Sequence, residues 1–105
     1  MRIIIDESIL RCFIGVFAQY DIVSVPYMGW VGKRDGELLK LMSEAGFNIF
    51  ITRNQEYRQS SEEPNLTVLV ICIETSSFDD LLATVPQIQE AITAAKPGTI
   101  YAIQK

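Results

Sequence analysis

The segment that most constrains the fold is an almost unbroken apolar run at residues 66–73, which reads LTVLVICI. Its hydrophobicity is continuous rather than alternating, which is typical of a strand buried on both faces. Strands of this kind occur in parallel sheets that helices cover on both sides. The run therefore predicts the central strand of an α/β sheet. It is too short to cross a bilayer, which takes about 20 apolar residues.

Strand and helix patterns alternate through most of the chain. The other predicted strands are residues 2–5, 21–25, 47–52 and 99–103. Apolar residues at helical spacing predict helices over 9–17, 35–45 and 77–92, the last one broken or kinked near Thr84 and Val85 by Pro86. This alternation predicts a three-layer α/β/α sandwich with a mostly parallel central sheet of about five strands. We expect one domain over residues 1–105, because a chain of this length can bury one core.

Composition excludes some chemistries and gives an expected location. The chain has no His, so it lacks the commonest general base and the commonest zinc ligand. Cys12 and Cys72 lie in apolar segments without a Cys-x-x-Cys spacing, which favours buried thiols over metal ligands or a disulfide. The formal net charge of −4 gives no overall attraction to nucleic acid. Asp6 interrupts the N-terminal apolar segment too early for a signal peptide, so we expect a cytoplasmic protein without a membrane segment.

Acidic residues gather where three predicted strands or helices would meet. Asp6 follows the first strand, Asp35 and Glu37 open the second helix, and residues 52–56 follow the third strand. All three places can converge on the carboxyl edge of the sheet, where ligands of open α/β sheets usually bind. Clustered carboxylates suit Mg²⁺ or Mn²⁺. Such an ion can activate water without His, and a phosphodiester is the natural substrate of such a site.

Each of these residues also has a purely structural interpretation. Asp6 and Asp35 stand where a side-chain oxygen would cap a helix, and Glu37 lies in a first turn where the helix dipole favours negative charge. Trp30 could stack on a base, but covering the core is the favoured interpretation for a loop tryptophan. The cations of the chain near these positions form either a phosphate-binding rim or a solvated face. They are Lys33, Arg34, Arg53 and Arg58.

The segments MRIIIDESI, GWVGKRDGELLKLMSEAGFNIFITRNQEY and LTVLVICI resemble the compact PIN-like (PilT N-terminus-like) domains, which are predicted ribonucleases of toxin–antitoxin systems. The resemblance covers nearly the whole chain, and residues 29–57 are its most specific part. It implies a PIN-like sandwich and Mg²⁺- or Mn²⁺-dependent cleavage of RNA by a small cluster of acids. It also implies a small antitoxin protein as partner. Asp6 matches the first-strand aspartate, and Asp35 and Glu37 match the acids that open the second helix.

The chain departs from the family pattern after the third strand. The family usually has Thr-x-Asp-x-Asp-Phe there, and residues 52–57 read TRNQEY. Asn54 thus replaces the first acid, while Glu56 keeps the second. An asparagine still offers a carbonyl oxygen, but the site loses one negative charge, and Arg53 would repel a cation if it turned inward.

Two functional hypotheses follow from these residues. The first is a metal-dependent endoribonuclease with Asp6 and Glu37 as metal ligands, Asp35 and Glu56 as additional acids, and Thr52 orienting a ligand or water. The second is a catalytically inactive PIN-like module that binds a protein partner. A phosphorylated receiver domain is set aside, because Thr52 ends the third strand where such domains have a phosphoaccepting aspartate. A homodimer is the expected assembly for a small sandwich.

Overall fold

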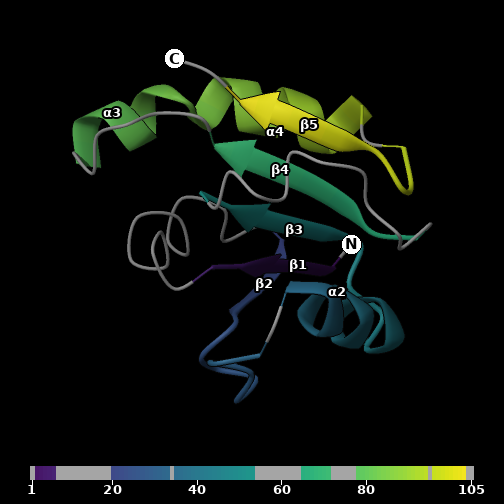
Figure 1. The fold of residues 1–105 in the computed structure, drawn as a ribbon. Helices are drawn as coiled ribbons and strands as arrows, with labels where there is room; N and C mark the ends of the chain where they lie inside the picture. The colour runs from purple at the N-terminus through teal and green to yellow at the C-terminus, as the bar shows by residue number, and fades with distance from the viewer. Residues whose placement is uncertain are drawn as a thin grey trace.

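A computed structural model of the chain describes residues 2–6, 20–33, 35–53, 65–71, 78–94 and 96–103. Its five strands are β1 (Arg2–Ile5), β2 (Asp21–Ser24), β3 (Ile49–Thr52), β4 (Thr67–Ile71) and β5 (Ile100–Ile103). They form one sheet in the order β2-β1-β3-β4-β5, and every neighbouring pair is parallel. Figure 1 shows this sheet with β2 at one edge and β5 at the other. The predicted α/β class and parallel sheet are confirmed.

The described helices are α2 (Asp35–Glu44), α3 (Phe78–Ala83) and α4 (Val85–Ala94). Leu38 and Met42 of α2 join a buried cluster with every second residue of the central strands, including Ile4 and Phe50. The intervening strand residues face the other way and join a second cluster with Ile88, Ala91 and Ile92 of α4. The alternating strand pleat thus separates two cores, one under α2 and one under α4. The sheet is the middle of three layers, as the sequence predicts.

The two crossovers that contain α2 and α4 have opposite hands. The chain runs from β2 to β3 and from β4 to β5 in the same direction along the sheet order. Two such crossovers share one hand only if their helices cover the same face, and α2 and α4 cover opposite faces. One of the two is therefore left-handed, whereas about 98% of crossovers between parallel strands are right-handed. This departure places the two helices in separate layers.

Helix α2 ends in a Schellman motif that leads directly into β3. Phe47 N donates to Met42 O at 3.1 Å, and Gly46 N donates to Ser43 O at 3.1 Å. Gly46 has a φ of 87°, which glycine adopts without the cost that a Cβ would add. The Arg2 guanidinium donates to Ala45 O and lies 4.3 Å from the centroid of the Phe47 ring. The predicted stop at Gly46 is confirmed, and Arg2 joins this helix end to β1.

Pro86 divides the segment after β4 into two helices, as the sequence predicts. The break falls at Thr84, which is fully buried and whose carbonyl accepts the first hydrogen bond of α4 from Ile88 N at 3.0 Å. Pro86 is the second residue of α4, in the first turn, where its missing N–H needs no partner. The break thus starts a new helix rather than distorting an existing one.

Trp30, in the loop after β2, packs against the core of the protein. Trp30 is partly buried in the cluster under α2, and its ring meets Phe47 edge to face with centroids 6.2 Å apart. The predicted core role of Trp30 is confirmed.

In the described part of the chain, none of the helices is long and apolar enough to cross a membrane. The predicted helix at 9–17, both cysteines and the loop at 54–64 lie outside the described residues.

Candidate functional site

The candidate site lies where the sheet order reverses. The chain continues from β1 to β2 on one side and reaches β3 on the other, so the carboxyl ends of β1 and β3 form the switch point of this sheet. Asp6 follows β1 and Thr52 is the last residue of β3. The Thr52 hydroxyl donates a hydrogen bond of 2.8 Å to Oδ2 of Asp6. Two of the predicted site residues are therefore in direct contact at the edge where ligands of such sheets usually bind.

The backbone fixes the position of both side chains. Asp6 N donates to Ile51 O at 3.0 Å, which continues the β1–β3 pairing by one residue beyond the strand. Thr52 is fully buried and lies opposite Val70 in the β3–β4 register, and the preceding residue, Ile51, pairs with Ile5 of β1, so strands on both sides anchor this end of β3. Thr52 also points to the same side of the sheet as Phe50, the side that α2 covers. The pair therefore stands in a rigid part of the fold.

The loop after β2 is attached to the same edge. Val25 N donates to Ile5 O at 2.9 Å, one residue before Asp6, and Trp30 N donates to Val25 O at 3.3 Å. The hydroxyl oxygen of buried Ser24 accepts a hydrogen bond of 3.1 Å from Tyr27 N. These contacts hold residues 25–30 as a compact turn beside the end of β1. Figure 1 shows this segment extending from the sheet at its β2 edge.

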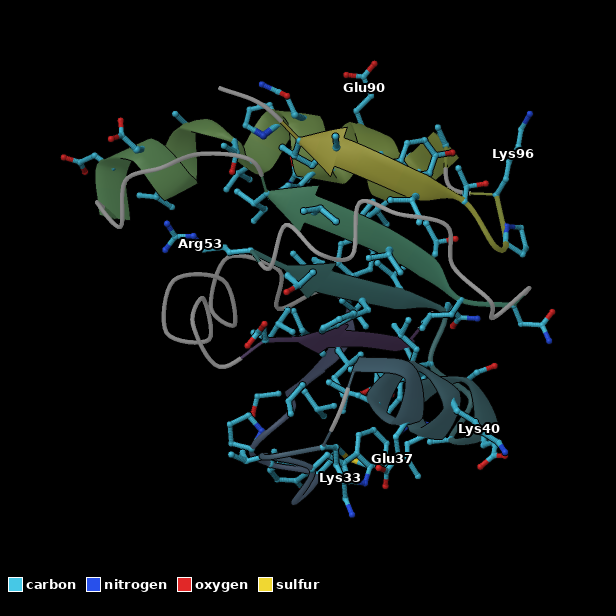
Figure 2. All side chains as sticks on the ribbon, viewed as in Figure 1. Lys33, Glu37, Lys40, Arg53, Glu90 and Lys96 are labelled. Carbon is cyan, nitrogen blue, oxygen red and sulfur yellow. The ribbon has the colours of Figure 1, made fainter. Side chains whose placement is uncertain are left out.

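Glu37, a predicted metal ligand, lies in an ion pair. Its Oε1 is 3.6 Å from Nζ of Lys33, and about half of each side chain is exposed. Figure 2 shows both side chains together, low in the view, while Arg53 projects from the end of β3. The structure thus brings Asp6 and Thr52 together and gives Glu37 a cationic partner. The Asp35 side chain, Asn54 and Glu56 lie outside the described part, so their predicted roles stay predictions.

Arg53 is the cation nearest to this pair in the sequence, and it comes directly after the last residue of β3. Its half-buried side chain extends from the sheet edge in Figure 2.

The oxygen donors at the switch point fit a hard divalent cation in kind. A carboxylate and a hydroxyl are ligands that Mg²⁺ accepts, and Mg²⁺ usually keeps several waters with only one or two carboxylates. Among the described residues, no group of three or more Asp, Glu, Cys or His could hold a metal ion. Asp6 would therefore need one further acid, and the sequence offers Glu37, Asp35 and Glu56.

No protein-family model, curated protein sequence or solved structure matches the chain. The assignment of roles therefore depends on the geometry and on the residues themselves. Sequence reasoning identified Asp6 and Thr52, but it missed Ser24 and Tyr27, which shape the neighbouring turn. The signal for that turn was present, since a serine two residues before a proline is typical of a turn start.

Proposed function

We propose that the chain is a PIN-like protein that uses Mg²⁺ or Mn²⁺ to cleave RNA at the carboxyl edge of its sheet, as a ribonuclease of toxin–antitoxin type. The contact between Asp6 and Thr52 carries this proposal. It puts a carboxylate on a rigid strand end at the switch point, where ligands of open parallel sheets bind. The resemblance of residues 29–57 to PIN-like domains gives the substrate class, which is RNA.

In this proposal Asp6 is the first metal ligand and Thr52 positions it. The hydrogen bond from the Thr52 hydroxyl leaves Oδ2 of Asp6 in one orientation, so the other carboxylate oxygen has a fixed direction as well. Glu37 is the second ligand, and Asp35 and Glu56 are the additional acids. A divalent ion held there would polarise a phosphodiester and lower the pKa of a bound water. In this proposal the protein supplies the carboxylate oxygen ligands and orients them around the ion.

Metal binding and RNA cleavage test the proposal together. Calorimetric titration with Mn²⁺ compares the wild type with Asp6→Asn and Glu37→Gln, and the same preparations are incubated with RNA. Thr93→Val is the matched control, because the Thr93 hydroxyl bonds only within α4, to Gln89 O at 3.0 Å. We expect the wild type and the control to bind and cleave, and both acid variants to lose binding. Wild-type protein that neither binds Mn²⁺ nor cuts RNA would refute the nuclease.

A specific observation also favours the second function, an inactive PIN-like module that binds a protein partner. Glu37 is already paired with Lys33, and Asn54 replaces an acid of the family pattern, so the count of available carboxylates is low. Each lost negative charge weakens the attraction for a divalent cation. This function predicts that the calorimetric titration detects no heat of Mn²⁺ binding. It also predicts that the chain co-purifies with a small protein encoded beside it.

A further inference from the structure

The large apolar side chains that the described residues expose both belong to the loop after β2. They are Tyr27, which is 78% exposed, and Val31, which is 57% exposed. Core positions of the sheet are buried in both clusters, so this exposure is a property of the loop and not of a loosely packed protein. A single exposed apolar residue is normal on a protein surface, so the exposure of Tyr27 gains meaning only from the turn that holds it and from the place of that turn in the fold.

Tyr27 is held in place by its backbone. Its N–H donates to the Ser24 hydroxyl at 3.1 Å, and the turn continues with Gly29 N to Pro26 O at 3.0 Å. The side chain of Ser24 is buried, so the turn is anchored to the sheet. Because the backbone is fixed, a ligand that covers the ring has to immobilise only its two side-chain torsions.

The position of this turn connects it to the proposed active site. Val25, at the base of the turn, donates to Ile5 O, and Asp6 is the next residue of the chain. Lys33 lies at the far end of the same loop, and its positively charged side chain is 43% exposed. An aromatic face and an ion-paired cation thus belong to one loop, whose first residue Val25 is bonded at the carboxyl end of β1.

The size of the patch favours a small planar ligand over a protein. One aromatic side chain offers roughly 150–250 Å². A stable protein interface needs about 800 Å² from each partner, which is several times what Tyr27 and Val31 can supply. A single nucleobase, in contrast, is matched by one aromatic ring, because every base has a flat face that stacks on such a ring. The excess of 13 acidic over 9 basic residues disfavours duplex RNA, whose recognition depends on backbone contacts.

From these observations we propose that Tyr27 is a nucleobase-stacking subsite, on which an unpaired base of the RNA lies while its backbone continues toward Asp6. The proposal rests on the proposed ribonuclease function for the identity of the ligand. The stacking contact itself needs no metal ion, so it can be tested separately from cleavage.

The test is an NMR titration of the full chain, with its tyrosine rings labelled, against a single-stranded RNA hexanucleotide in EDTA at low salt. The chain has four tyrosines, and a Tyr27→Ala spectrum assigns the Tyr27 signal. We expect the Tyr27 signal to move upfield while the signal of Tyr101, whose hydroxyl bonds Ala94 O, stays in place. Stacking on one ring contributes enough that Tyr27→Ala should weaken binding at least about fivefold.

Two matched variants identify the contact. Tyr27→Phe keeps the ring and should bind like the wild type, and Val31→Ala removes an exposed side chain of the same loop and should also change little. An unmoved Tyr27 signal in the wild type, or equal weakening in Tyr27→Phe and Tyr27→Ala, would overturn the subsite. So would self-association that Tyr27→Ala abolishes, because the ring would then contact a second copy. RNA binding without cleavage in Mn²⁺ would retain the subsite and refute the nuclease.

Discussion

The hydroxyl of Thr52 and the carboxylate of Asp6 are joined by a 2.8 Å hydrogen bond, although they lie 46 positions apart in the chain. The contact crosses from β1 to β3, so it forms only when the switch point of the sheet is assembled. It is both a structural link and the centre of the candidate site. A substitution at Thr52 therefore has a predicted effect on stability as well as on function.

We expect Thr52→Val to lower the free energy of unfolding by roughly 1–3 kcal/mol, because it removes a donor to a charged group at a fully buried position while keeping the side-chain shape. Urea denaturation followed by circular dichroism measures this loss. Thr93→Val removes a hydrogen bond of similar length on the exposed side of α4 and should cost much less. Equal losses in the two variants would show that the Asp6 contact adds nothing.

Two glycine substitutions should change stability in opposite directions. Gly46→Ala should destabilise the protein by about 1 kcal/mol, because alanine at a φ of 87° is strained. A Cβ there would lie 3.6 Å from Arg2 Nη1, an ordinary contact, so the cost comes from the backbone. Gly36→Ala, inside α2 with open space around the new Cβ, should stabilise by up to about 1 kcal/mol. Thermal unfolding of both variants compares the signs, and a shared sign would contradict this prediction.

Arg2 should contribute more to stability than its ion pair alone. It donates to Ala45 O at the end of α2, stacks on Phe47 and lies 3.5 Å from Asp21. We expect Arg2→Met to cost about 1–2 kcal/mol, since it removes a cation from a helix C-terminus and from an aromatic face. Asp21→Asn should cost less than about 0.5 kcal/mol, because the pair is exposed and screened by solvent. Denaturant titration separates the two, and a larger loss in Asp21→Asn would assign the effect to the ion pair.

Glu37→Gln should leave the fold almost unchanged. Its pair with Lys33 is half exposed, and such pairs contribute on the order of 0.3–0.5 kcal/mol. Any large loss of Mn²⁺ binding in this variant would then report on the metal site itself. The midpoint of urea denaturation, measured on the calorimetry sample, verifies this. A shift equivalent to more than about 1 kcal/mol would show a structural role for Glu37 and remove its value as a probe.

The sequence was sufficient for most of the fold. Continuous apolar runs identified the strands because a parallel sheet buries both faces, and Pro86 and Gly46 marked helix ends because their backbone chemistry permits little else. The strand order and the opposite hands of the two crossovers were not predictable, since both depend on packing between distant segments. The candidate site was predicted in part. Acids at strand ends identified Asp6, but the spacing of Lys33 and Glu37 did not reveal that they would pair.

The separation of the two buried clusters by the sheet has a consequence for how the protein tolerates change. Side chains under α2 and side chains under α4 contact opposite faces of the same strands and belong to different clusters. Paired substitutions, one in each cluster, should therefore act almost additively on stability. Thr52 faces the α2 side, so the α4 side can diverge in sequence, or be redesigned, without repacking the surroundings of the candidate site.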